Sequence, residues 1–160
     1  MRRGWLFLTL SLLLVGCDHG TKLAAARLLP GQPVSLVSGW LELRYAENRD
    51  IAFSALSALH LPASRALLLV FGVLAMFAIA VAWARTRARS LPSDAGFALV
   101  LAGAAGNLLD RAFRGYVVDF VHLTHWPVFN VADVLIVVGA IVLAASNLRG
   151  PTRRSERPAG

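Results

Sequence analysis

Residues 66–84 form an uninterrupted apolar run, and this run restricts the folds open to the chain more than any other feature. The segment contains no charged side chain and no amide or hydroxyl side chain. About 20 consecutive apolar residues are enough for a helix to cross the hydrocarbon core of a bilayer. The run therefore predicts a transmembrane helix.

Three further apolar runs, at residues 5–26, 95–109 and 131–148, are separated by polar segments. The chain is 57% hydrophobic and its mean hydropathy is +0.62, which is too apolar for an ordinary soluble domain. We predict an all-α polytopic membrane protein with four transmembrane helices, forming a single domain over residues 1–148.

The longest polar connection, residues 28–62, predicts a small β-sheet outside the membrane. Residues 34–37 and 40–45 are the strand candidates, and in the second strand apolar side chains alternate with Glu42 and Arg44. We expect these strands to form an antiparallel sheet that lies on the membrane surface.

The third predicted span carries local signals for its start and its packing. Pro92 breaks the preceding segment, and either Ser93 or Asp94 is the expected N-cap. Gly103 and Gly106 are small enough for a neighbouring helix to approach closely. This span is therefore expected to lie against another helix.

Arginines decide the predicted orientation. Most of them lie at one side of a four-span arrangement: Arg2, Arg3, Arg85, Arg87, Arg89 and the arginines of the tail at 149–160, which we expect to be disordered. The positive-inside rule places this side and both termini in the cytoplasm. Because the net charge of +7 comes mostly from these residues, we expect no nucleic-acid partner.

Carboxylates gather at the predicted outer ends of the helices. Asp18 and Lys22 are four apart in the first span and can form an ion pair. Asp119 lies in the predicted loop after the third span, and Asp133 begins the fourth. A carboxylate beside hydrocarbon is costly unless it is paired or faces a polar cavity, so these residues predict a site at the outer surface.

Two aspartates at the rim of an apolar bundle would share one proton, which is what an aspartic peptidase requires. Asn130 shares a helix face with Asp133, and Asn107 shares one with Arg111. Spacing alone leaves open whether these polar groups form a site or only bond the helices to each other.

A zinc site is an alternative chemistry. Asp119, His122 and His125 are spaced three apart, and two histidines with a carboxylate can bind zinc. The spacing is poor for metal binding, and Pro127 interrupts the segment directly afterwards. We therefore prefer surface histidines and no metal.

Two other classes of protein fit parts of the pattern. The basic N-terminus, the apolar stretch and the lipobox-like residues from Leu14 to Cys17 are typical of a lipoprotein leader, which would make the chain a membrane-anchored lipoprotein. Against this, apolar character resumes at residues 23–26. A transporter would use Asp18, Lys22 and Asp133 as a proton relay, but the three are expected at one membrane level.

Four motif blocks stand in order along nearly the whole chain: DHGTK at 18–22, NRDIAFS at 48–54, GNLLDR with GYVVDF at 106–120, and FNVAD at 129–133. Together they resemble the motifs of bacterial lipoprotein signal peptidase (signal peptidase II). One residue departs from the family pattern, because Asp50 stands where the family commonly has glycine.

This resemblance implies a metal-free and cofactor-free aspartic endopeptidase of the bacterial cytoplasmic (inner) membrane, with its active site at the extracytoplasmic face. It implies cleavage of diacylglyceryl-modified prolipoproteins before the lipidated cysteine, contact with membrane lipid, and inhibition by cyclic peptides such as globomycin. We expect a monomer. By position, the catalytic pair is Asp119 and Asp133; the substrate site contains Asn48, Asn107, Arg111 and Asn130; and Asp18, Lys22 and Asp110 give structural support.

Overall fold

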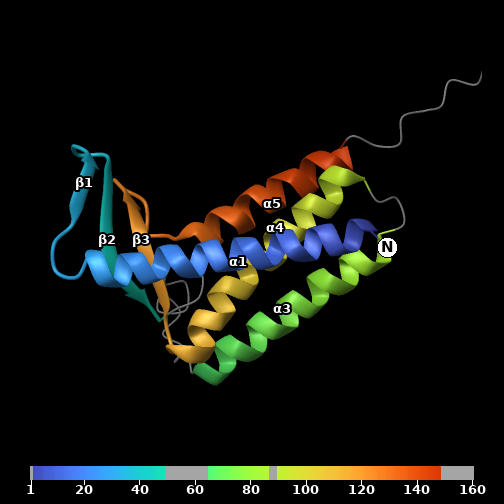
Figure 1. Cartoon of the computed structure of the whole chain (residues 1–160), viewed down its shortest axis with the longest axis horizontal. Coiled ribbons are helices and arrows are strands. Elements are labelled where there is room, and N and C mark those ends of the chain that lie inside the picture. The colour runs from blue at the N-terminus through green and yellow to red at the C-terminus, as the bar shows by residue number, and fades with distance from the viewer. Residues whose placement is uncertain (1, 50–64, 87–89, 149–160) are drawn as a thin grey trace, which may run out of the picture.

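The computed structural model describes residues 2–49, 65–86 and 90–148. Predictions that concern residues 50–54, Arg87, Arg89 and the tail lie outside the described residues. The helices are α1 (Arg2–Leu28), α3 (Arg65–Arg85), α4 (Leu91–Phe113) and α5 (Val131–Leu148), and the strands are β1 (Val34–Val37), β2 (Leu41–Asn48) and β3 (Val117–Leu123). The helices extend along the long axis of the molecule, and the strands lie across one end (Figure 1).

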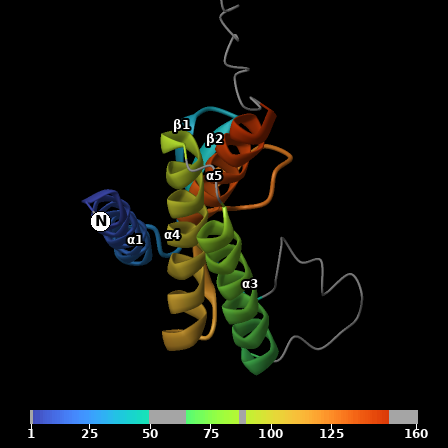
Figure 2. The same ribbon diagram turned by 90° about the vertical axis from the view of Figure 1, so that its right-hand side faces the viewer.

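Helix α4 is the centre of the bundle, because it contacts α1, α3 and α5 (Figure 2). Its small residues allow this packing. A Cβ atom at Gly103 would collide with the carbonyl oxygen of Ala132, and one at Gly106 would lie 2.5 Å from Asp18 Oδ2. The close helix approach predicted at these two glycines is confirmed.

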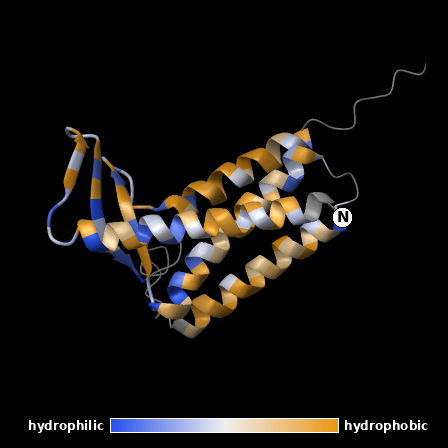
Figure 3. Ribbon diagram, in the orientation of Figure 1, coloured by the Kyte–Doolittle hydropathy of each residue, from blue (hydrophilic) through white to orange (hydrophobic). Residues whose placement is uncertain are grey.

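The bundle is apolar outside and polar inside. Phe77 and Ile141 are 67% and 61% exposed, whereas Lys22 and Asn130 are 0% exposed. Figure 3 shows the same pattern, with apolar residues along the helices and hydrophilic residues concentrated towards the sheet. A surface of this kind is stable in lipid, where outward-facing apolar side chains meet hydrocarbon.

Three of the described helices are long and apolar enough to cross a membrane: Trp5–Leu28, Ala66–Arg85 and Val131–Leu148. Helix α4 does not meet the same criterion within the described residues. It carries Asp94, Asn107, Asp110 and Arg111, and its neighbours shield it on several sides. The structure therefore supports a mostly helical membrane protein with three candidate spans, and the predicted number of four is not confirmed.

The strands form one antiparallel sheet in the order β1-β2-β3. Strand β1 has the predicted bounds, and β2 extends three residues beyond its predicted end. Strand β3 is a correction, because the segment around Asp119 was predicted to be a loop. It pairs with β2 along its length, from Leu41 opposite Leu123 to Asn48 opposite Val117.

Two contacts fix the ends of the bundle. Near the sheet, Ala25 and Leu29 of α1 pack with Val118 and Phe120 of β3. At the other end, Ser90 is the N-cap of α4 and its side chain accepts a bond from the Ser93 N–H at 3.2 Å. The predicted N-caps, Ser93 and Asp94, were therefore wrong by at least three residues. The Asp94 carboxylate instead accepts a hydrogen bond from Trp83 Nε1 at 2.7 Å, which joins α3 to α4.

Candidate active site

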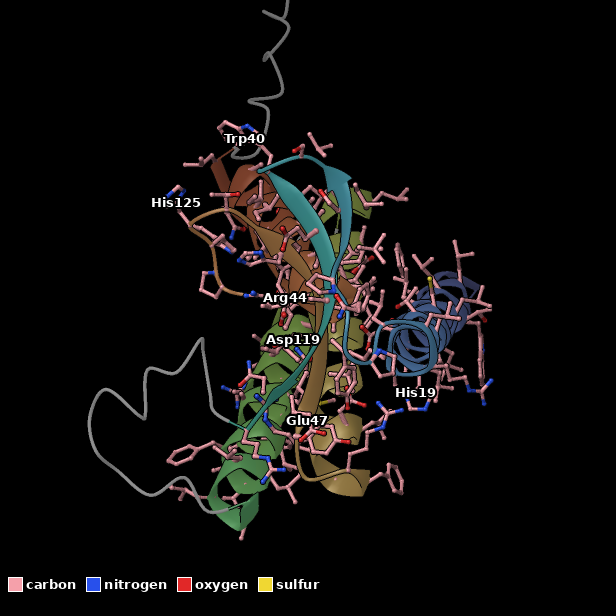
Figure 4. The ribbon with its side chains drawn as sticks, turned by 90° about the vertical axis from the view of Figure 1, so that its left-hand side faces the viewer. His19, Trp40, Arg44, Glu47, Asp119 and His125 are labelled. Carbon is pink, nitrogen blue, oxygen red and sulfur yellow. The ribbon has the colours of Figure 1, made fainter. Side chains whose placement is uncertain are left out.

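Strand β3 carries Asp119 into the junction between the sheet and the helices. The residue is 2% exposed and lies opposite Ala46 of β2. Asn48, at the end of β2, donates from Nδ2 to Asp119 Oδ2 at 2.9 Å. In Figure 4, which views the sheet end, Asp119 lies near the middle, whereas Trp40 and His125 lie towards one rim. Sheet pairing therefore brings Asn48 to Asp119.

Asp133 is held by the start of α5. The backbone N–H of Asp133 donates to Asn130 Oδ1 at 3.0 Å, and the backbone N–H of Asn130 donates to Asp133 Oδ2 at 3.2 Å. This reciprocal arrangement of an N-cap residue and the third helical residue is a capping box. The capping box at the start of α5 therefore fixes the orientation of the Asn130 and Asp133 side chains.

Two amide side chains connect the aspartates. Asn130 Nδ2 donates to Asp119 Oδ1 at 2.6 Å and to Asn107 Oδ1 at 3.2 Å. Asn107 Nδ2 donates to Asp133 Oδ1 at 2.8 Å. Residues from β2, β3, α4 and the start of α5 therefore form one hydrogen-bonded unit, which we call the Asp–Asn network: Asn48, Asn107, Asp119, Asn130 and Asp133.

The protonation of Asp119 follows from its surroundings. The pKa of Asp119 is raised to about 6, chiefly by burial and also by the negative charge of Asp133. Hydrogen bonds from Asn48 and Asn130 act in the opposite direction, because they favour the ionised carboxylate. Asp119 can therefore hold a proton at a pH where an ordinary aspartate is ionised.

A buried ion cluster lies directly behind the Asp–Asn network. Lys22 Nζ is 2.7 Å from Asp18 Oδ2 and 3.0 Å from Asp110 Oδ2. The predicted pair between Asp18 and Lys22 is therefore confirmed. Asp110 also pairs with Arg114 at 2.6 Å, a contact that the sequence prediction missed although the two residues are four apart on one helix.

The carboxylates of this cluster also bind backbone groups. Asp18 Oδ1 accepts a bond from the Ala132 N–H at 2.9 Å, and Asp110 Oδ2 accepts one from the Val118 N–H at 3.3 Å. The cluster therefore joins α1 to the start of α5 and α4 to β3.

Arg111 is placed close to the same unit. Its Nη1 donates to the backbone oxygen of Asn107 at 3.4 Å. Its positive charge interacts with the negative charges of Asp119 and Asp133. Of the substrate-site residues inferred from the resemblance, Asn48, Asn107, Arg111 and Asn130 all lie at the aspartates. Spacing along the helices predicted the pairs on α4 and α5 but gave no signal for Asn48.

The histidines do not join Asp119. Successive side chains of a strand point to opposite faces, so Asp119 and His122, three apart on β3, point in opposite directions. His122 Nδ1 instead lies 3.6 Å from Glu42 Oε2 on the neighbouring strand. Within residues 2–49, 65–86 and 90–148, no group of three histidine, cysteine or acidic side chains is placed to hold a metal ion.

The lipobox-like residues lie inside a continuous helix. Leu14 to Cys17 are in the middle of α1, and Asp18 and Lys22 follow in the same helix with partners on α4 and α5. Cys17 itself is exposed. Cleavage before Cys17 would separate the first half of α1 from residues that hold the bundle together, which disfavours the lipoprotein interpretation.

An apolar groove of about 240 Å³ opens beside Asp133. Its other lining residues come from the end of β3, the following turn and the outer face of α5: Leu123, Trp126, Phe129, Val134, Val137 and Val138. A carboxylate at the edge of such a groove can act on a polar bond whose neighbouring groups are apolar.

Comparison with known proteins gives one consistent family. The family model described as signal peptidase (SPase) II matches residues 10–149. A lipoprotein signal peptidase of Mycolicibacterium smegmatis is 40% identical over 156 residues, which cover 93% of this chain and 63% of that protein. The corresponding protein of Geobacter metallireducens is 35% identical over 144 residues, which cover 87% and 88% of the two chains.

Solved structures support the fold. A structure described as a bacterial membrane enzyme superposes with a TM-score of 0.81, at 21% sequence identity, over 97% of this chain and 94% of that one. A second structure with the same description has a TM-score of 0.79 over 91% of this chain. At this identity the likeness shows that the arrangement of helices and sheet is shared.

Proposed function

This chain belongs to the signal peptidase II family of lipoprotein signal peptidases, and we propose that it is an aspartic endopeptidase with Asp119 and Asp133 as its catalytic pair. The observation that carries the proposal is the Asp–Asn network, in which Asn130 and Asn107 bond both carboxylates. Polar side chains are costly to bury beside hydrocarbon even when they bond one another, so the concentration of these residues next to the groove supports a role in chemistry.

The two carboxylates take different roles in this mechanism. Asp119, whose pKa burial raises to about 6, holds the proton that the pair shares. Asp133, which is only half-buried and lies at the groove, is the base that takes a proton from the attacking water. Asp119 gives its proton to the carbonyl oxygen as the water oxygen bonds to the carbonyl carbon.

The tetrahedral intermediate then collapses. Asp133 passes its proton to the leaving nitrogen, the C–N bond breaks, and Asp119 recovers the proton from the hydroxyl group. Asn107 and Asn130 keep the carboxylates in place through both steps, because each aspartate accepts a bond from one of their amide groups. Arg111 adds positive charge close to the site, where it would stabilise the partial negative charge that the carbonyl oxygen carries while Asp119 protonates it.

The substrate class proposed is the diacylglyceryl-modified prolipoprotein, cut before its lipidated cysteine. A substrate of this kind is apolar on both sides of the scissile bond, which suits the apolar groove at Asp133. Membrane lipid would surround the outward-facing helices. The same apolar approach would admit a cyclic peptide such as globomycin as an inhibitor, and the protein would act as a monomer.

The membrane arrangement proposed has four spans. Helix α4, despite its polar residues, is the span added to the three candidates α1, α3 and α5. Helix α4 has 23 residues, which is longer than α3 and α5, and it lies between its neighbours in the bundle (Figure 2). The start of α1 and the end of α5 lie at the end of the bundle away from the sheet (Figure 1). Helix α1 begins at Arg2 and α3 ends at Arg85 on that side (Figure 1), so by the positive-inside rule both termini would be cytoplasmic and the site extracytoplasmic.

A cleavage assay tests the proposal. The purified protein is mixed with a lipid-modified prolipoprotein, and wild type is compared with Asp119→Asn and Asp133→Asn. Each variant should lose activity by about 10³-fold or more, because an amide can neither accept nor supply the proton. Asp94→Asn, at the other end of α4, is the control and should keep its activity per folded molecule. Near-normal cleavage by Asp119→Asn or Asp133→Asn would refute the assignment of the catalytic pair.

A further inference from the structure

Lys22 makes a contact that a purely supporting role does not explain. Its ammonium group has three N–H donors, and three acceptors lie around it: Asp18 Oδ2 at 2.7 Å, Asp110 Oδ2 at 3.0 Å and Asn107 Oδ1 at 2.9 Å. The two carboxylates already more than balance the single positive charge of Lys22. The third donor connects the buried ion cluster to the Asp–Asn network.

The chemistry of the ammonium group sets the orientation of the Asn107 side chain. An ammonium group can only donate hydrogen bonds, so Asn107 must present its oxygen to Lys22. Its Nδ2 is then directed to Asp133, where it donates to Oδ1 at 2.8 Å. If the amide were reversed, Nδ2 would meet the donors of Lys22 and Asn130, and Asp133 would face an oxygen.

Asn130 is oriented by a different group. Its Oδ1 accepts from the backbone N–H of Asp133, which leaves Nδ2 to donate to Asp119 and to Asn107. The two amides are therefore fixed from opposite sides of the site, one by the α5 backbone and the other by a cation on α1. Together they supply an N–H donor to each aspartate.

We propose that Lys22 is a positioning residue for the cleavage reaction, which acts through Asn107 on Asp133. The ammonium group itself touches neither the reacting atoms nor the groove. Its effect is to keep the Asn107 N–H on one oxygen of Asp133, so that the carboxylate is held in one orientation for the attacking water. This inference rests on the proposed role of Asp133 as the base.

The charged groups around Lys22 allow a test that distinguishes an effect of Lys22 on the orientation of Asn107 and Asp133 from an effect on the stability of the fold. Removal of Lys22 alone leaves Asp18 and Asp110 buried with one partner fewer, which would destabilise the fold. The comparison is therefore between Asp18→Asn and the double mutant Lys22→Met/Asp18→Asn, which differ only in Lys22. Asp110 keeps its pair with Arg114 in both.

The expected result is a loss of kcat without an equal loss of stability. The double mutant should melt close to Asp18→Asn, but its kcat should be about 10²-fold lower, with KM within about twofold. Lys22→Gln/Asp18→Asn restores a neutral N–H donor and should recover kcat at least about tenfold above the Met variant. If the double mutant does not purify, a triple mutant that adds Asp110→Asn is compared with Asp18→Asn/Asp110→Asn, and the same fall in kcat is expected.

Equal kcat values for Asp18→Asn and for a folded variant that lacks Lys22 would overturn the proposal, and so would the absence of recovery with glutamine. Asp133→Asn, measured in the same assay, distinguishes this failure from failure of the catalytic assignment. If Asp133→Asn cleaves normally, the assignment of Asp119 and Asp133 as the catalytic pair is wrong. If it is inactive while the Lys22 variants are normal, only the role of Lys22 is wrong.

Discussion

Asp18 accepts a hydrogen bond from the backbone N–H of Ala132, the residue directly before Asp133, at 2.9 Å. The first N–H groups of a helix have no partner within the helix, and a negative charge near them is favourable. Asp18 thus satisfies one of the first N–H groups of α5 while it pairs with Lys22. Asp110 binds the Val118 N–H next to Asp119 in a similar way. The backbone beside each proposed catalytic residue is therefore held by a carboxylate from a different element, Asp18 of α1 for α5 and Asp110 of α4 for β3.

Substitution of Asp18 should show this double role. Asp18→Asn keeps an oxygen for the Ala132 N–H and loses only the charge, whereas Asp18→Ala loses both. We expect both variants to have a lower Tm in detergent, and the alanine variant to be less stable than the asparagine variant by about 1–2 kcal/mol. Thermal melts measure the difference. Equal Tm values for the two variants would show that the bond to Ala132 contributes little.

The histidines provide the test of a metal mechanism. His122→Ala and His125→Ala, separately or together, should leave more than about half of the activity, since His122 lies on the opposite face of β3 from Asp119 and His125 lies towards the rim of the sheet end (Figure 4). EDTA should have little effect on the wild type. A loss of activity that added zinc restores would instead support the metal alternative.

Much of the site was predictable because its residues are polar in apolar surroundings. The pair of Asp18 and Lys22 follows from helical spacing, and Asn107 and Asn130 are easily recognised as amides beside hydrocarbon. The contact of Lys22 with Asn107 was not predictable. The two residues are 85 positions apart, and helical spacing shows only which residues share a face of the same helix, not which faces of two helices meet. Asn48 was identified from the family resemblance alone.

The fold was predicted less completely where long-range pairing decides it. Strand β3 contains the buried residues Val117, Val118 and Phe120, yet it was interpreted as a loop because its partner β2 lies about 70 residues earlier. The start of α4 was misplaced because several residues near Pro92 can cap a helix. Ser90 is the one whose backbone is extended and whose side chain reaches the Ser93 N–H.

Asp119 should make the stability of the protein depend on pH. Its pKa is about 6 in the folded protein, whereas an unfolded aspartate has a pKa of about 3.9. Between these values the folded state binds more protons, so the free energy of unfolding falls as pH rises. The contribution is fully present below about pH 4 and is lost as pH rises through about 6, by about 3 kcal/mol in total.

Asp119→Asn removes this titration. The Tm of the variant relative to wild type should therefore increase between pH 4 and pH 7, whatever the constant cost of the substitution. Melting curves of the two proteins at several pH values give the difference. Parallel Tm profiles would mean that the Asp119 carboxylate is not protonated more readily in the folded protein than in the unfolded chain.

The orientation in the membrane can be tested with a reporter enzyme that is active only outside the cytoplasm. Fusions after Gly31, between α1 and β1, and after Arg114, between α4 and β3, should be active because both points lie at the sheet end of the bundle (Figure 1). Fusions after Arg87 and Arg153 should be inactive, because the basic residues there favour the cytoplasmic side. A cytoplasmic reporter at the same four positions is the control and should give the opposite pattern. The Arg87 and Arg114 fusions flank α4, so opposite results at these two positions would establish it as a span, and equal results would show that the chain crosses the membrane fewer than four times.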